Sequence, residues 1–89
     1  MNANQDSLNG RAFAENYIKV RIPDATSFRW DNLCVPPHED FDFDFVSFRV
    51  GGVVTQVRLR CQALDNGDEA EIRAWVAAQT RDFELPRRA

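Results

Sequence analysis

Residues 41–64 read FDFDFVSFRVGGVVTQVRLRCQAL, two strand-like runs joined by Gly51 and Gly52. In the second run apolar and polar residues alternate. This is typical of a strand with one buried face, because side chains in a strand point to opposite faces with a period of two. The Gly-Gly pair accepts the positive φ angles of a two-residue hairpin turn. The cross-strand pairs that this β-hairpin predicts are Val50 with Val53, Phe48 with Thr55 and Val46 with Val57.

The first run changes phase at Phe45 and Val46, two adjacent apolar residues. In a regular ladder this change would point Asp42 and Asp44 into the core. Two unpaired carboxylates there would be very costly. A regular hairpin therefore conflicts with the sequence of its own first strand.

One extra residue at Phe45–Val46, a β-bulge, would resolve the conflict and return Phe41 and Phe43 to the core. The bulge would also create two favourable cross-strand charge pairs, Asp44 with Arg58 and Asp42 with Arg60. We therefore predict a bulged hairpin. The alternative left open is a strand that begins near Phe45, preceded by a loop.

The segments before the hairpin carry weaker signals. Residues 1–10 are polar and predict a flexible tail, and residues 11–16 predict one or two helical turns. Residues 17–22 alternate like a strand that Pro23 ends. Residues 27–35 form either a short hairpin or a loop that inserts Trp30 and Leu33 into the core.

After the hairpin, Asp68 is a good helix N-cap, and Glu71 follows three residues later in a capping-box-like arrangement. The helix should run to about Arg81. We therefore expect an α+β fold: a small two-layer domain over residues 11–85, with a bulged central hairpin in an antiparallel sheet of three to five strands and one C-terminal helix packed on it. Residues 86–89 would be a tail.

Composition limits the compartment and the partners. The chain has 89 residues, a net charge of −3 and a pI ≈ 5.0, which gives no bulk attraction to nucleic acid. The N-terminus lacks a signal pattern, and no run approaches the ~20 apolar residues of a membrane span. We expect a cytoplasmic protein without membrane association, with Cys34 and Cys61 as reduced thiols. A disulfide between them is the alternative, but it lacks a secreted context.

The acidic run before and within the hairpin resembles a metal site in part of its spacing. Asp40, Asp42 and Asp44 have the spacing that opens a calcium loop, but Phe45 stands where that loop needs glycine. Alternate residues of a strand are also ~6.6 Å apart, too far for three carboxylates to share one ion. His38 has no nucleophile near it in sequence. We expect no metal, no cofactor and no catalytic residue.

The leading hypothesis is a small non-enzymatic protein that binds a larger protein partner as an inhibitor or accessory subunit. By size and charge only, it is of the anti-restriction, anti-CRISPR or immunity-protein type, and the partner could be a nucleic-acid-handling complex. A homodimer through a sheet edge is left open. The candidate partner-binding residues are His38, Glu39, Asp40, Asp42, Asp44 and Trp30.

The alternative hypothesis is single-stranded nucleic-acid binding through an Arg-rich outer face of the sheet, formed by Arg49, Arg58 and Arg60. The acidic balance weighs against it. So does the expected fold, which turns the aromatic residues inward and leaves Tyr17 as the one ring that could lie outside.

Overall fold

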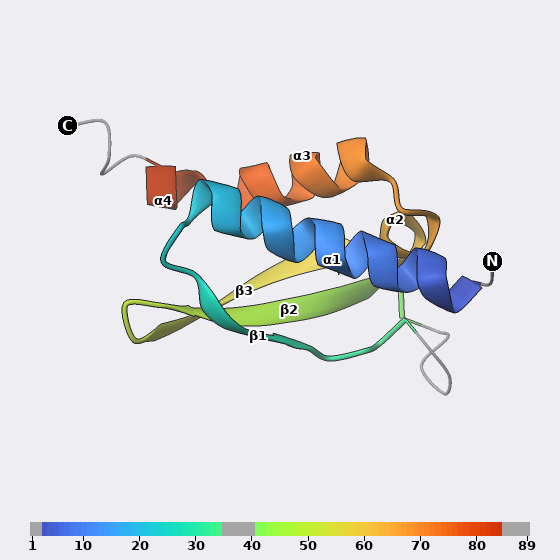
Figure 1. The fold of residues 1–89 in the computed structure, drawn as a ribbon, viewed down its shortest axis with the longest axis horizontal. Helices are drawn as coiled ribbons and strands as arrows, with labels where there is room; N and C mark the ends of the chain where they lie inside the picture. Colours follow the sequence, from blue (N-terminus) through green and yellow to red (C-terminus); the bar gives the residue numbers. More distant parts are fainter. Residues whose placement is uncertain (1–2, 35–40, 85–89) are drawn as a thin grey trace.

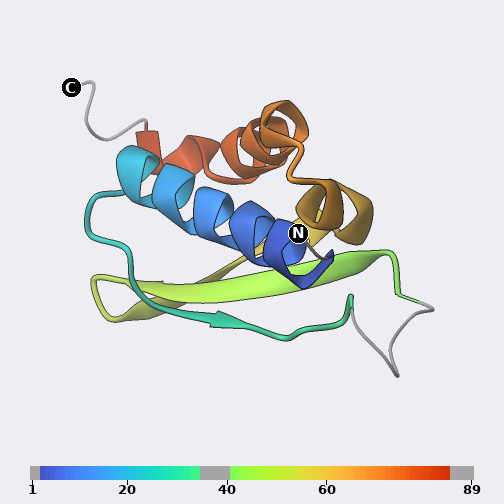
Figure 2. The ribbon, with the colours of Figure 1, turned by 45° about the vertical axis from the view of Figure 1, so that its right-hand side comes forward.

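The computed structural model describes residues 3–34 and 41–84. The elements in chain order are α1 (Ala3–Arg21), β1 (Thr26–Trp30), β2 (Phe43–Val50), β3 (Val53–Arg60), α2 (Cys61–Asn66), α3 (Glu69–Gln79) and α4 (Arg81–Glu84). The strands form an antiparallel sheet in the order β1-β2-β3. Figures 1 and 2 show the helices on one face of this sheet, and no helix or strand of the described residues covers the other face. The α+β class is confirmed.

The tip of the hairpin has the predicted geometry. Gly51 and Gly52 have φ angles of 58° and 85°, which a type I′-like turn requires. The three pairs expected from the alternation are all present, Val50 with Val53, Phe48 with Thr55 and Val46 with Val57.

The predicted bulge at Phe45–Val46 is wrong. Strands β2 and β3 pair without interruption from Phe43, opposite Arg60, to Val50. Asp44 therefore lies opposite Leu59 and is buried. Phe41, expected in the core, is 50% exposed.

An irregularity of this kind occurs instead in β1. The register between β1 and β2 shifts between Thr26 and Arg29. Ser27 lies in this interval with a φ of 60°, in the left-handed region that L-residues seldom adopt. The extra residue thus bends the edge strand and leaves the central hairpin regular.

The predicted strand over residues 17–22 is also wrong, because these residues continue α1 to Arg21. Residues 3–10, expected to be a tail, are its first turns. The residues spaced by four along α1 are buried, whereas Val20, which fitted the alternating pattern, is 72% exposed. This buried stripe comprises Gly10, Ala14 and Ile18, and Ile22 continues it directly after the last residue of α1.

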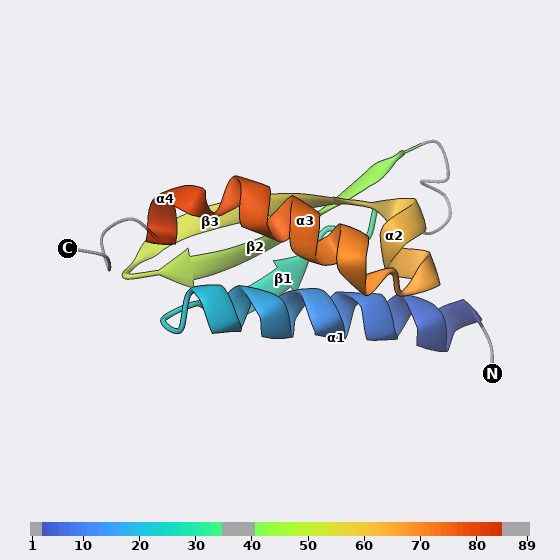
Figure 3. The ribbon, with the colours of Figure 1, turned by 90° about the horizontal axis from the view of Figure 1, so that it is seen from above.

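Gly10 sits inside α1 because two backbones meet there. A Cβ atom at this position would overlap the carbonyl group of Leu64 in α2. The missing side chain lets α1 approach α2 closely, and Figure 3 shows the two helices adjacent at one end of the layer. A residue type that disfavours helices is thus a packing requirement of this one.

The C-terminal half is more helical than expected. Strand β3 ends at Arg60, and Cys61 begins α2 rather than continuing the strand. The predicted N-cap of α3 is confirmed, since the Asp68 carboxylate accepts the N–H of Glu71 at 3.2 Å. In place of one C-terminal helix, α1 and α3 lie side by side on the sheet (Figure 3).

The core lies between the sheet and these two helices. It is formed by Ala14, Ile18, Ile22, Ala25, Val46, Phe48, Val57, Leu59, Ala63, Leu64, Ile72 and Val76. None of the helices in the described parts of the chain is long and apolar enough to cross a membrane.

Candidate functional site

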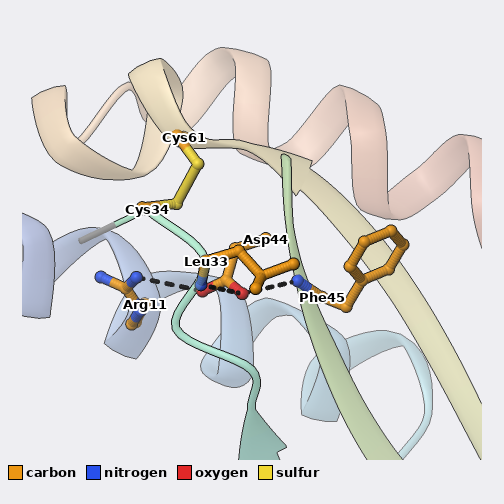
Figure 4. The surroundings of a disulfide bond; sticks show 6 residues. All are labelled: Arg11, Leu33, Cys34, Asp44, Phe45 and Cys61. Carbon is orange, nitrogen blue, oxygen red and sulfur yellow. Dashed lines mark hydrogen bonds and ion pairs between the residues drawn. A yellow bond between two sulfur atoms is a disulfide. The ribbon is translucent and has the colours of Figure 1, made fainter. Parts of the chain in front are cut away.

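Asp44 is held in the core by a charge partner from α1 (Figure 4). Its side chain is fully buried and accepts hydrogen bonds from Arg11 Nη2 at 3.0 Å and from the N–H groups of Leu33 at 3.1 Å and Phe45 at 2.8 Å. An ion pair supported by further hydrogen bonds is the arrangement in which a buried carboxylate is tolerated. Asp44 is therefore a structural residue and not an exposed contact.

Cys34 and Cys61 form a disulfide, with their Cα atoms 5.3 Å apart. The expectation of two reduced thiols is wrong for this structure. The backbone N–H of Cys61 also donates to the carbonyl of Asp42 at 2.8 Å. Cys61 is thus bonded to the residues on both sides of the segment 35–41, through its sulfur to Cys34 and through its N–H to Asp42.

Trp30 does not lie on a free surface. It is opposite Val46, so its side chain is on the helix-covered face of the sheet and is partly buried. Its indole N–H donates to Glu15 in α1 at 2.7 Å, and the Arg11 guanidinium carbon lies 5.4 Å from the ring centroid. These contacts attach β1 to α1.

The remaining candidate partner contacts lie at or beyond the start of β2. His38, Glu39 and Asp40 fall outside the described residues. Asp42 is exposed and lines an open recess of about 670 Å³ together with Arg60. Of the six predicted contacts, Asp42 alone lies exposed in the described part of the chain.

The face of the sheet opposite the helices carries a different set of side chains, which we call the open face. Residues directly opposite each other on adjacent strands share a face. Arg29, Ser47 and Gln56 form one row, because Ser47 is paired with both of the others. The other rows are Phe45 with Arg58, and Thr26 with Arg49 and Val54.

The open face is basic although the chain is acidic. Arg29, Arg49 and Arg58 are exposed, and each comes from a different strand. The nearest carboxylate in sequence is Asp31, which follows β1 and whose N–H donates to the Phe45 carbonyl at 3.0 Å. The three exposed guanidinium groups give this face a positive charge that favours an anionic partner.

All three members of the predicted arginine set lie on this face by register, with Arg60 opposite Phe43, but the Arg60 side chain is engaged by neighbouring side chains. Arg49 and Arg58 lie as expected. Arg60 forms an ion pair with Glu71 at 3.2 Å and a hydrogen bond with Gln62 at 2.7 Å. Arg29 and Phe45 were missed, and the signal for Phe45 was the regular alternation rejected because it buried Asp44.

Aromatic and amide side chains close the β3 edge beside the open face. The Arg58 guanidinium carbon lies 4.8 Å from the centroid of the Phe43 ring and 5.4 Å from that of Trp75. The Gln79 side chain donates to the Arg58 carbonyl at 2.8 Å and accepts its N–H at 3.0 Å, as a neighbouring strand would. These contacts hold Arg58 in place and cover the backbone of β3 at this position.

Comparisons of the chain with protein-family models, with curated proteins and with solved structures gave no match.

Proposed function

We propose that the protein is a small non-enzymatic binding module that engages a larger, anionic partner through the open face of its sheet. The observation that carries this proposal is the exposure of Arg29, Arg49 and Arg58 on one face, from three different strands. Because the whole chain has a net charge of −3, this basic face means that positive and negative side chains lie on different parts of the surface. Such separation steers association and orientation more than it adds affinity.

The helix layer holds the sheet in a fixed conformation. The side chains that share strands with the open face, such as Val46, Phe48 and Val57, are buried under α1 and α3. The backbone that presents the arginines is therefore fixed before a partner arrives, which lowers the entropic cost of binding.

The experiment compares two charge-matched triple variants as baits in extracts of the native host. Arg29→Gln, Arg49→Gln and Arg58→Gln neutralise the open face. Lys19→Gln, Arg73→Gln and Arg81→Gln remove the same charge from exposed positions on the helix layer. We expect the captured material to be lost with the first variant and retained with the second. Equal capture by both variants, or equal loss, would overturn the proposal.

A second candidate is the inhibitor or accessory subunit that binds a protein through the acidic residues before β2. The double attachment of Cys61, to Cys34 and to Asp42, favours it, because it fixes both ends of the segment that carries Glu39 and Asp40. For this candidate, Glu39→Lys with Asp40→Lys should abolish capture of a protein from nuclease-treated extract. Capture that survives this double variant would contradict it.

A further inference from the structure

We infer that the open face takes single-stranded nucleic acid, with Phe45 as the stacking surface for a base and Arg29, Arg49 and Arg58 as contacts to phosphates. This inference rests on the open face being the contact surface. It adds the class of partner, and it stands on a second observation besides charge, the position of an aromatic ring among the arginines.

Phe45 is on the open face because the hairpin register is regular. It is directly opposite Arg58 and follows Asp44, which points into the core. Its ring is partly exposed. The aromatic residue that was missing from the outer face of the hairpin in the sequence-based argument is therefore present in the structure.

Two arginines flank this ring across the sheet, and Asp31, whose N–H donates to the Phe45 carbonyl, lies on its β1 side. Arg58 is the direct cross-strand neighbour of Phe45, with Cβ atoms about 5 Å apart in such pairs. Arg29 is opposite Ser47 and so diagonal to Phe45, at roughly 7–8 Å. Phosphates on either side of a base stacked on the ring would meet Arg29 on the β1 side and, on the β3 side, the Arg58 guanidinium where it lies over Phe43 and Trp75.

Neutral polar groups complete the surface. Ser47 lies two residues along β2 from Phe45, and Gln56 donates to its hydroxyl at 3.5 Å. Serine and glutamine can both donate to and accept from base edges. An acidic protein surface would use the arginines but has no need of the ring, whereas an unpaired base uses both. A duplex hides its base faces, so stacking on Phe45 selects single strands.

The test is fluorescence anisotropy of a labelled 12-nucleotide oligothymidylate, titrated with the whole oxidised chain at several salt concentrations. If three phosphates are contacted, the logarithm of the binding constant should fall with the logarithm of salt with a slope of about −2. Arg49→Gln should reduce the magnitude of that slope by about 0.7. A duplex of the same length should bind more weakly.

Phe45→Ala should weaken binding by about 5- to 150-fold without changing the slope, since stacking is not electrostatic. Phe45→Leu keeps an apolar side chain and protects the fold, so it should show the same loss if stacking is the cause. The matched control is Val20→Ala. Val20 is an apolar side chain that is 72% exposed, and it belongs to α1, in the helix layer on the other face of the sheet (Figure 1). It should bind like the parent chain.

Three results would overturn the inference: no binding at low salt, equal binding of duplex and single strand, or unchanged affinity in both Phe45 variants. These failures are separable from failure of the proposed function. If the oligonucleotide does not bind but the open-face triple variant still loses a protein captured after nuclease treatment, the open face is the contact surface and its partner is a protein. If the open-face substitutions change neither oligonucleotide binding nor capture from the extract, both proposals are wrong.

Discussion

The two faces of the sheet treat charge in opposite ways. On the covered face, Asp44 is fully buried and is neutralised by Arg11, which reaches it from α1. On the open face, Arg29, Arg49 and Arg58 remain exposed. The buried charge of Asp44 is stabilised by an ion pair with Arg11, which is distant in sequence. The exposed arginine charges are stabilised by water. Substitutions on the covered face should therefore change stability, and those on the open face should change binding alone.

The largest effect is expected from Arg11→Met, which leaves Asp44 buried without its charge partner. Removing one member of a buried ion pair should cost about 3–5 kcal/mol of the free energy of unfolding, measured by urea denaturation. Arg49→Met on the open face is the control and should stay within about 0.5 kcal/mol. Adding Asp44→Leu to Arg11→Met should recover only part of the loss, because the N–H groups of Leu33 and Phe45 then lose their acceptor. A single variant as stable as the parent chain would contradict the proposed role of the pair.

A somewhat smaller effect is expected from Cys34→Ser with Cys61→Ser. The disulfide joins residues 27 apart in sequence, and loss of such a loop constraint should cost about 3 kcal/mol through the entropy of the unfolded chain. Urea denaturation of the parent chain with and without a dithiol reductant gives the same comparison without a substitution. The serine variant itself should not respond to the reductant. A parent chain equally stable in both conditions would show that the disulfide does not stabilise the fold.

The smallest expected effect on stability comes from making the same substitution on each of the two faces of β3. Val57 is fully buried on the covered face, whereas Val54 is 61% exposed on the open face. Threonine has the shape and strand preference of valine but adds a hydroxyl group. Val57→Thr should cost about 1–3 kcal/mol because that hydroxyl is buried, and Val54→Thr should stay within about 0.5 kcal/mol. Equal thermal midpoints for the two variants would contradict the description of one face of β3 as buried and the other as exposed.

Local pattern was sufficient to predict some elements. The turn at Gly51-Gly52, the pairing near it and the N-cap at Asp68 follow from short-range rules, and all three are confirmed. The register of the hairpin far from its turn, where Phe43 and Asp44 pair with β3, was not predictable in this way. It depends on whether Asp44 can be buried, and the residue that permits this, Arg11, is 33 positions away.

Only the turns over residues 11–16 of helix α1 were predicted, because two periodicities overlap in the sequence that follows. Ile18, Val20 and Ile22 fit a strand, while Ile18 and Ile22 also fit a helical stripe that continues back through Ala14 and Gly10. Gly10 usually weakens a helix, and only the contact with Leu64 explains its presence. Tertiary contact decided between the two patterns.

The candidate site was affected by the same error. Predicting a bulge placed Asp44 among the exposed contacts and turned the aromatic residues inward. In the observed register Asp44 is buried and Phe45 is partly exposed on the open face. The arginines at 49 and 58 were assigned to the outer face correctly, because they lie where strand alternation is regular.

The sequence separation of Arg11 and Asp44 also bears on the order of folding. The β2–β3 hairpin consists of local contacts and is the kind of element that forms within microseconds. Before α1 docks, the face of the hairpin that carries Asp44 is in water, so its carboxylate costs little in either register. Docking of α1 buries Asp44 and supplies its guanidinium partner in the same step. The N-terminal helix thus both creates the burial and provides the counter-ion that makes it tolerable.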